Sequence, residues 1–174
     1  MKKAISIWQI AGFGATAALG TLLHFVYDWT GGSSIAALFS AVNESTWEHM
    51  KLLFLPMLIF AIIQSKFFKE HEGFWCIKLR GIALGLILIP VIFYTYNGVI
   101  GKSPDWVNIS IFFISAAIAY LVEARLFKRG FTCSTQKIAL AIICIIALLF
   151  FVFTFATPRI DLFKDPIDGS FGIK

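Results

Sequence analysis

Charged residues are scarce in this sequence. Only 14% of its 174 residues are Asp, Glu, Lys or Arg, against about 25% in a typical soluble domain. Hydrophobic residues make up 59%. A chain of this length could form one soluble domain, but so few charges would not cover its surface. The composition therefore excludes a soluble globular domain and favours a chain that lies in a lipid bilayer.

Cysteine is rare as well. The chain has three cysteines, of which Cys76 and Cys133 fall between the longest apolar segments and Cys144 falls inside one. Their spacing fits neither a zinc site nor a disulfide framework. We therefore expect three reduced thiols.

Five segments are long and apolar enough to cross a bilayer, which takes about 20 residues of helix. They cover residues 5–27, 46–68, 77–96, 107–127 and 137–156. The first could be read as a signal peptide with a small-residue site at residues 15–17, but its apolar stretch continues well past that site. Because lipid offers the backbone no hydrogen bonds, each segment must be a helix. The sequence predicts an all-α integral membrane protein, with one transmembrane domain over residues 1–174 and a polar tail over 157–174.

Basic residues are distributed unequally between the two sides of this predicted bundle. One side carries ten of them, Lys2, Lys3, Lys66, Lys69, Lys78, Arg80, Arg125, Lys128, Arg129 and Lys137, and the other side carries the remaining five. Cytoplasmic connections are enriched in Lys and Arg, so we expect a plasma-membrane protein with its N-terminus in the cytoplasm and its C-terminus outside. The formal net charge of +5 then reflects the basic residues that orient the chain in the membrane. Because no basic stripe is paired with base-stacking aromatics, we expect no nucleic-acid partner.

The connection between the first two segments, residues 30–44, is unusual. Gly31, Gly32 and two serines precede an apolar run over residues 35–42 that is too short to span. Irregular backbone at membrane depth is tolerated only where protein or water covers it. We expect a short half-helix there, either interfacial or re-entrant.

Small residues mark two helix faces for close packing. Gly12, Thr16 and Gly20 share one face of the first segment, and Gly81 and Gly85 form a GxxxG pair in the third. Such faces let helix backbones approach closely. A second copy of the chain could dock through Gly81 and Gly85, which would give a homo-oligomer in the lipid bilayer.

Ionisable residues gather at the outer ends of the first two segments. His24 and Asp28 are four residues apart and so share a helix face, and a polar stretch that includes Glu44 and Glu48 opens the second segment. A short hairpin joins the two segments, so these ends should be neighbours. The predicted pocket contains His24, Asp28, Asn43, Glu44, Trp47, Glu48, His49 and Lys51. Pro90 should kink the third helix and bring Tyr94, Tyr96 and Asn97 toward this pocket.

Imidazole nitrogens and carboxylate oxygens are ligands for zinc, manganese and iron. We expect His24, Asp28, Glu44 and His49 to hold a divalent metal. Glu48 or Glu44 would be the base when the metal activates water for hydrolysis of a lipid-borne or periplasmic substrate.

A structural interpretation of the same residues stays open. Ser45 and Glu48 have the spacing of a capping box, so Glu48 could serve only to begin its helix. Glu44 would be favoured there by the helix dipole. Lys51 could pair with Glu48 or extend to the membrane surface.

Two other functions also stay open. A kinked bundle with buried acids could transport a small solute or cation, although transport sites lie near the midplane and the inner half offers only Gln64 and Glu123. Glu123 itself should form a salt bridge with a nearby arginine or lie at the membrane interface. A structural or partner-binding subunit is the third interpretation.

Four segments on the outer side carry a resemblance. They are residues 23–29, 42–51, 96–102 and 162–169, and the second contains Asn-Glu-Ser-x-Trp-Glu-His at residues 43–49. The sequence resembles an uncharacterised family of small bacterial multi-pass membrane proteins, catalogued as a domain of unknown function. The resemblance covers nearly the whole chain and implies the topology, and it lends no activity.

Overall fold

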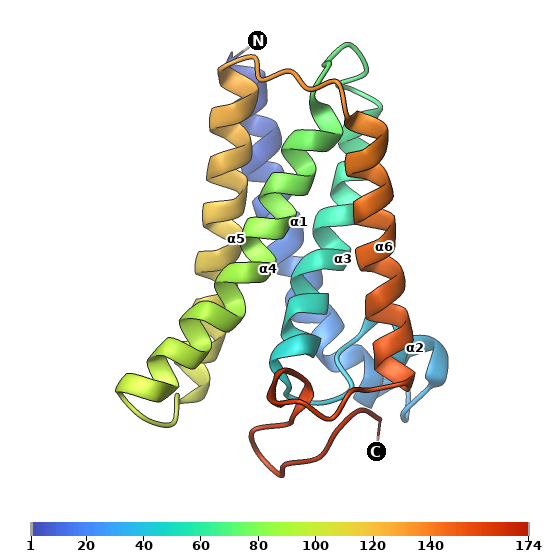
Figure 1. Cartoon of the computed structure of the whole chain (residues 1–174), viewed down its shortest axis with the longest axis vertical. Helices are drawn as coiled ribbons and strands as arrows, with labels where there is room; N and C mark the ends of the chain where they lie inside the picture. Colours follow the sequence, from blue (N-terminus) through green and yellow to red (C-terminus); the bar gives the residue numbers. More distant parts are fainter. Residues whose placement is uncertain (1, 174) are drawn as a thin grey trace.

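The computed structural model describes residues 2–173. Figure 1 shows five long helices side by side, with a short helix at one end of the bundle. The elements are α1 (Lys2–Trp29), α2 (Ser34–Phe39), α3 (Thr46–Ser65), α4 (Phe74–Val99), α5 (Asp105–Lys128), α6 (Gln136–Phe155) and the 3-10 turn η1 (Asp161–Phe163). All five long helices have the length and apolar composition needed to cross a membrane. The predicted all-α multi-pass bundle and its half-helix are therefore confirmed.

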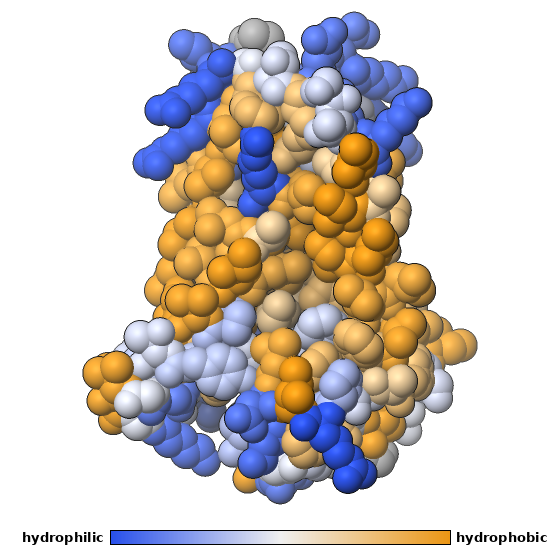
Figure 2. Space-filling view, viewed as in Figure 1, coloured by the Kyte–Doolittle hydropathy of each residue, from blue (hydrophilic) through white to orange (hydrophobic). Residues whose placement is uncertain are grey.

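The two ends of the bundle differ in chemistry. The basic end carries Lys2 and the connections 66–73 and 129–135, and the tail end carries α2, the connection 100–104 and residues 156–173. Figure 2 shows an apolar band between these two hydrophilic ends. The band has the character of a surface that faces lipid.

The small-residue face of α1 is used as predicted. A Cβ added to Gly12 would lie 2.5 Å from the ring of Tyr120 and 2.7 Å from that of Phe60. One added to Gly20 would lie 2.5 Å from Phe112. Because real Cβ atoms do not approach so closely, only glycine lets α1 pack this tightly against α3 and α5.

Gly81 and Gly85 lie inside the chain's own bundle. A Cβ on Gly81 would collide with the carboxylate of Glu123, and one on Gly85 would lie 2.8 Å from Leu53 and 3.4 Å from Ala119. Both glycines are buried. A second copy of the chain cannot dock on Gly81 and Gly85 as predicted, because α3 and α5 already cover both glycines. Homo-oligomerisation itself stays a prediction.

The expectation of three free thiols is wrong for two of them. Cys76 near the start of α4 and Cys133 in the connection before α6 form a disulfide, with their Cα atoms 6.4 Å apart. These residues are 57 positions apart in sequence, so their spacing along the chain holds no sign of the pairing. Cys144 is free and exposed.

Candidate metal site at the tail end

Three side chains of metal-ligand type meet at the tail end of α1 and α3. The carboxylate of Glu44 lies between two imidazoles, with Oε1 3.5 Å from His24 Nε2 and Oε2 3.5 Å from His49 Nε2. The ligand atoms of all three residues lie within 4.8 Å of one another. Tetrahedral zinc with bonds of 2.0–2.2 Å places neighbouring ligands about 3.4 Å apart. The two 3.5 Å spacings match this value, and they also match an ion pair with one protonated imidazole.

Each of the three residues is placed by a local feature of the sequence. His24 lies one turn beyond Gly20 on the packed face of α1, and His49 lies in the first turn of α3. Glu44 directly precedes Ser45, whose side chain caps α3 by accepting the backbone N–H of Glu48. That cap fixes where α3 begins, and hence where Glu44 and His49 lie.

The backbone orients one imidazole for ligation. His49 Nδ1 lies 3.0 Å from the carbonyl oxygen of Ser45. When Nδ1 carries the hydrogen and donates it to this carbonyl, Nε2 presents a lone pair toward Glu44. Metal-binding histidines commonly have such a partner on their second nitrogen.

The C-terminal tail pins the loop that carries Glu44. The backbone N–H of Glu44 donates to Asp165 Oδ2 at 3.2 Å, and the side-chain amide of Asn43 donates to the carbonyl oxygen of Gly172 at 3.0 Å. The 3-10 turn η1 packs against α3, where Phe163 lies 4.7 Å from Trp47 between ring centroids. The tail thus docks on the site.

A cleft of about 440 Å³ opens beside the three ligands, between α1, α3 and α5. Figure 1 shows α4 running obliquely across the bundle, so that its tail-end half and α5 diverge from α3 and α6. Polar groups lie at the tail end of the cleft and apolar ones deeper in the bundle. The cleft is lined by Gly20, Thr21, His24, Phe25, Glu44, His49, Leu52, Asp105, Asn108, Ile109, Phe112, Phe113 and Ile167.

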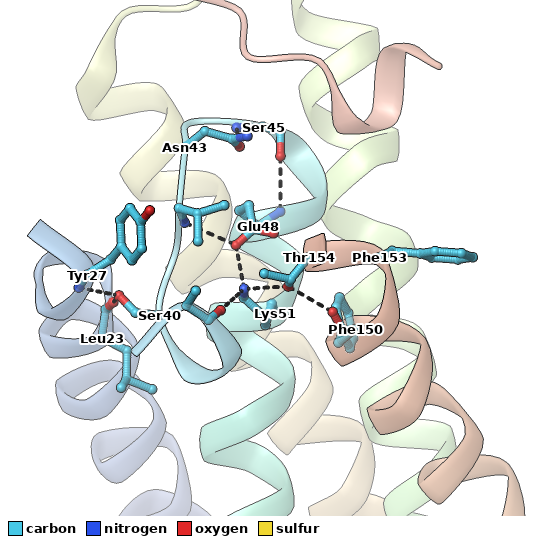
Figure 3. Close-up of polar contacts among 12 residues, drawn as sticks. Leu23, Tyr27, Ser40, Asn43, Ser45, Glu48, Lys51, Phe150, Phe153 and Thr154 are labelled. Atoms are coloured by element: carbon cyan, nitrogen blue, oxygen red, sulfur yellow. Dashed lines mark hydrogen bonds and ion pairs between the residues drawn. The ribbon is translucent and has the colours of Figure 1, made fainter. Parts of the chain in front are cut away.

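Lys51 and Glu48 form a separate buried network, shown in Figure 3. Lys51 Nζ lies 2.6 Å from Glu48 Oε2 and donates to the carbonyl oxygen of Ala37 at 2.8 Å and to Thr154 Oγ1 at 3.0 Å. The same Glu48 oxygen accepts the backbone N–H of Val42. Lys51 therefore pairs with Glu48 and does not extend to the membrane surface. The pair ties α2 and α6 to the start of α3.

Glu48, Asp28 and Trp47 lie outside the three-ligand cluster. The carboxylate of Glu48 is occupied by Lys51, which leaves Glu44 as the only predicted base within the described cluster. Asp28 is exposed at the end of α1 and is not among the clustered ligands. Trp47 is buried, with its ring centroid 4.4 Å from that of Phe150, so it packs the tail end and does not reach the cleft.

The residues at the end of α4 that were predicted to complete the pocket do not line the described cleft. Asn97 donates to the carbonyl oxygen of Phe93 and bonds with Ser103, which closes the turn between α4 and α5. Tyr94 is 40% exposed and Tyr96 packs against the core. Asn97 therefore closes the hairpin, and none of the three residues lines the described cleft.

Sequence reasoning missed the polar residues that α5 contributes. Asp105 and Asn108 line the cleft opposite the histidines. Their spacing of three residues at a helix start places both on one face. That spacing could have been noticed, but nothing in the sequence says that α5 lies opposite α1 and α3.

Glu123 forms a salt bridge, as predicted, but with a different partner. Its Oε2 lies 2.5 Å from Lys78 Nζ, and both side chains are buried. Lys78 was counted among the orienting charges, whereas the structure places it inside the bundle.

Comparison with known proteins identifies the family of the chain but assigns it no activity. A family model described as a family of unknown function, DUF6512, matches residues 1–173. No curated protein and no solved structure matches the chain.

Proposed function

The chain belongs to this family of unknown function, and from its site we propose that His24, Glu44 and His49 bind a divalent metal ion for hydrolysis of a membrane-embedded substrate. The observation that carries the proposal is the bridging position of Glu44, 3.5 Å from each imidazole. Two histidines and one glutamate form a ligand set that catalytic zinc uses with a water molecule in the fourth position. A bound metal would lower the pKa of that water.

The cleft beside the ligands supports a substrate with a polar head and an apolar chain. His24, Glu44 and Asn108 line its tail end, where a polar head would lie. Phe112 and Leu52 line the deeper part, which lies within the apolar band. An amphiphile that enters from the bilayer would therefore present its head to the metal ligands.

Metal binding is the first test. Purified full-length protein in detergent should bind about one equivalent of Zn²⁺, measured by calorimetry and elemental analysis. His24→Ala, His49→Ala and Glu44→Gln should each weaken binding by more than the roughly 10- to 100-fold loss seen when a residue that only hydrogen-bonds a metal ligand is changed. Asp28→Asn is the matched control, because this exposed acid lies outside the cluster, and it should leave the affinity unchanged. Absence of stoichiometric metal, or equal affinity in wild type and His49→Ala, would show that the proposal is wrong.

Transport of a small solute or cation is the second candidate. It is favoured by buried polar side chains in the basic half, Gln9, Gln64, Lys78 and Glu123, which sequence reasoning only partly found. Uptake of the metal into protein-containing vesicles, compared with protein-free vesicles, distinguishes transport from hydrolysis.

We also propose a plasma-membrane location with the basic end in the cytoplasm. The excess of lysine and arginine at that end supports this orientation. The Cys76–Cys133 disulfide at the same end argues for the opposite orientation, because disulfides are rare in the cytosol, so the orientation needs a direct test. In a cysteine-free variant, the exposed site Lys102→Cys should react with an impermeant maleimide in intact cells, and Glu70→Cys should not. The reverse labelling would place the basic end outside.

A further inference from the structure

Four polar side chains from four helices are buried together in the basic half. Gln9 of α1 is 4% exposed, Gln64 of α3 0%, Lys78 of α4 1% and Glu123 of α5 0%. Aromatic contacts place them at one level of the bundle. Phe60 meets Tyr120 on the tail side, with ring centroids 6.3 Å apart, and Phe68 meets Phe127 on the basic side at 5.3 Å. Along the chain, Gln64 lies between Phe60 and Phe68, and Glu123 lies between Tyr120 and Phe127. Gln9 lies between Ile5, which packs in one cluster with Phe127, and Gly12, which lies against Tyr120.

Lys78 lies in a cage of aromatic rings at this level. Its Nζ is 5.6 Å from the ring centroid of Tyr120 and 5.8–5.9 Å from those of Phe60, Phe74 and Phe127. Ring faces attract a cation, and Glu123 supplies the opposite charge. Both the rings and the carboxylate therefore favour the charged form of the Lys78 side chain.

The other polar atoms at this level have no partner in the described chain. Both amide atoms of Gln9, both of Gln64, and Glu123 Oε1 are buried without a hydrogen bond. Such groups are costly to leave unsatisfied, and native proteins contain few of them. Buried water commonly satisfies groups of this kind. Five of them at one level therefore indicate water bound among the four helices.

Further polar groups extend from this level toward the cleft. Thr16 Oγ1 and Tyr120 Oη lie 2.8 Å apart and are buried. Ser115, two turns before Glu123 on α5, is buried with its hydroxyl unpartnered. Asn108, two turns further, lines the cleft. One side of α5 thus carries hydrogen-bonding groups from the cleft to Glu123.

A hollow of about 790 Å³ lies on the opposite side, at the basic end. Its lining includes Ile5, Phe68 and Phe127. Phe68 and Phe127 also form the basic-side aromatic contact described above. Among the described residues, an apolar layer that includes these side chains therefore lies between the buried polar level and the basic end.

We propose that Gln9, Gln64, Lys78 and Glu123 form a hydrated proton-binding site, through which protons pass between the cleft and the basic end. A proton delivered by water adds to Glu123 Oε1, and the same proton later leaves to water on the other side, so no atom is consumed. The charged or titratable groups facing Glu123 in the described chain are Lys78 of α4 and Tyr120 of its own helix. Gln9 of α1 and Gln64 of α3, which lie at the same level, are uncharged. The proposal does not depend on metal binding at the tail end.

Proton flux across vesicles tests this site. Full-length protein is reconstituted into liposomes containing a pH-sensitive dye, and a potassium gradient with valinomycin drives protons inward. Wild-type protein should acidify the lumen faster than protein-free liposomes do. The double variant Lys78→Met/Glu123→Gln removes the charges while keeping the side-chain volumes, and its flux should fall to the protein-free rate.

Two further variants separate a proton route from a structural role. Glu48→Gln/Lys51→Met removes a buried pair of the same kind outside the proposed route, and it should retain the wild-type flux. Gln9→Leu/Gln64→Leu keeps the ion pair but removes the amides that bind water, and it should lose flux even if the first double variant does not fold. A wild-type flux equal to that of protein-free liposomes, or an unchanged flux in the glutamine variant, would overturn the proposal.

Discussion

The described part of the chain buries two Lys–Glu pairs, one toward each end of the bundle, and their surroundings differ. At the tail end, Lys51 contacts Glu48, a carbonyl oxygen and a hydroxyl, and Glu48 also accepts a backbone N–H. At the basic end, Lys78 contacts Glu123 within aromatic rings, and one oxygen of Glu123 has no partner in the described chain. The pairs share their chemistry and differ in how fully their hydrogen bonds are satisfied.

This difference separates structural stabilisation from binding. Removing one partner of a buried pair leaves the other charge uncompensated, which is costly wherever no water can reach it. The tail-end network holds α2 and α6 against α3 and has little free hydrogen-bonding capacity. The basic-end pair retains such capacity, and this is what a site for water or a proton requires.

Lys51→Met should have the largest effect on stability. It leaves the Glu48 carboxylate buried in a network built around an ammonium ion, and we expect a loss of about 3–5 kcal/mol in the free energy of unfolding. Unfolding by SDS in mixed micelles, followed by circular dichroism, measures this loss. A change below about 1 kcal/mol, the size expected for an exposed pair, would mean that the tail-end pair is not structural.

Lys78→Met should cost less, although Lys78 is as deeply buried. We expect a loss of about 1–3 kcal/mol, because water at this level can protonate the unpaired Glu123 and satisfy its oxygens. The same unfolding measurement applies, with the two variants compared side by side. If Lys78→Met destabilises the protein as much as Lys51→Met does, the two pairs do not differ in the way proposed.

Gly81→Ala tests the basic-end pair without removing a charge. The added methyl group would collide with the Glu123 carboxylate, and overpacking of this kind costs about 1–3 kcal/mol. Gly98→Ala is the matched control on the same helix, since nothing lies within 4 Å of its Cβ position. It should leave stability unchanged or raise it by up to about 1 kcal/mol through helix propensity. Equal effects of the two variants would show that Glu123 is not held against Gly81.

The contrast between the pairs also shows how far sequence reasoning reached. The five spans follow from apolar length alone, and the cap at Ser45 and the pairing of Glu48 with Lys51 are visible because these residues are three apart. His24, Glu44 and His49 could be grouped because a short hairpin joins their helices. Lys78 and Glu123 are 45 positions apart, and only the packing of α4 against α5 shows that they meet. Unpartnered atoms cannot be recognised in a sequence, because they depend on which side chains meet in the fold.

The smallest expected effect concerns the start of α3, where the tail-end pair is positioned. Ser45→Ala removes the side-chain oxygen that accepts the N–H of Glu48, and loss of such a cap costs about 1 kcal/mol. Ser110→Ala is the matched control. Its hydroxyl bonds a carbonyl within its own exposed helix face, and the change should stay within about 0.5 kcal/mol. Because the cap also sets the position of Glu44, Ser45→Ala should weaken Zn²⁺ binding while the proton flux stays at the wild-type level. A fall in flux as well would mean that the two ends of the bundle act as one site and are not independent.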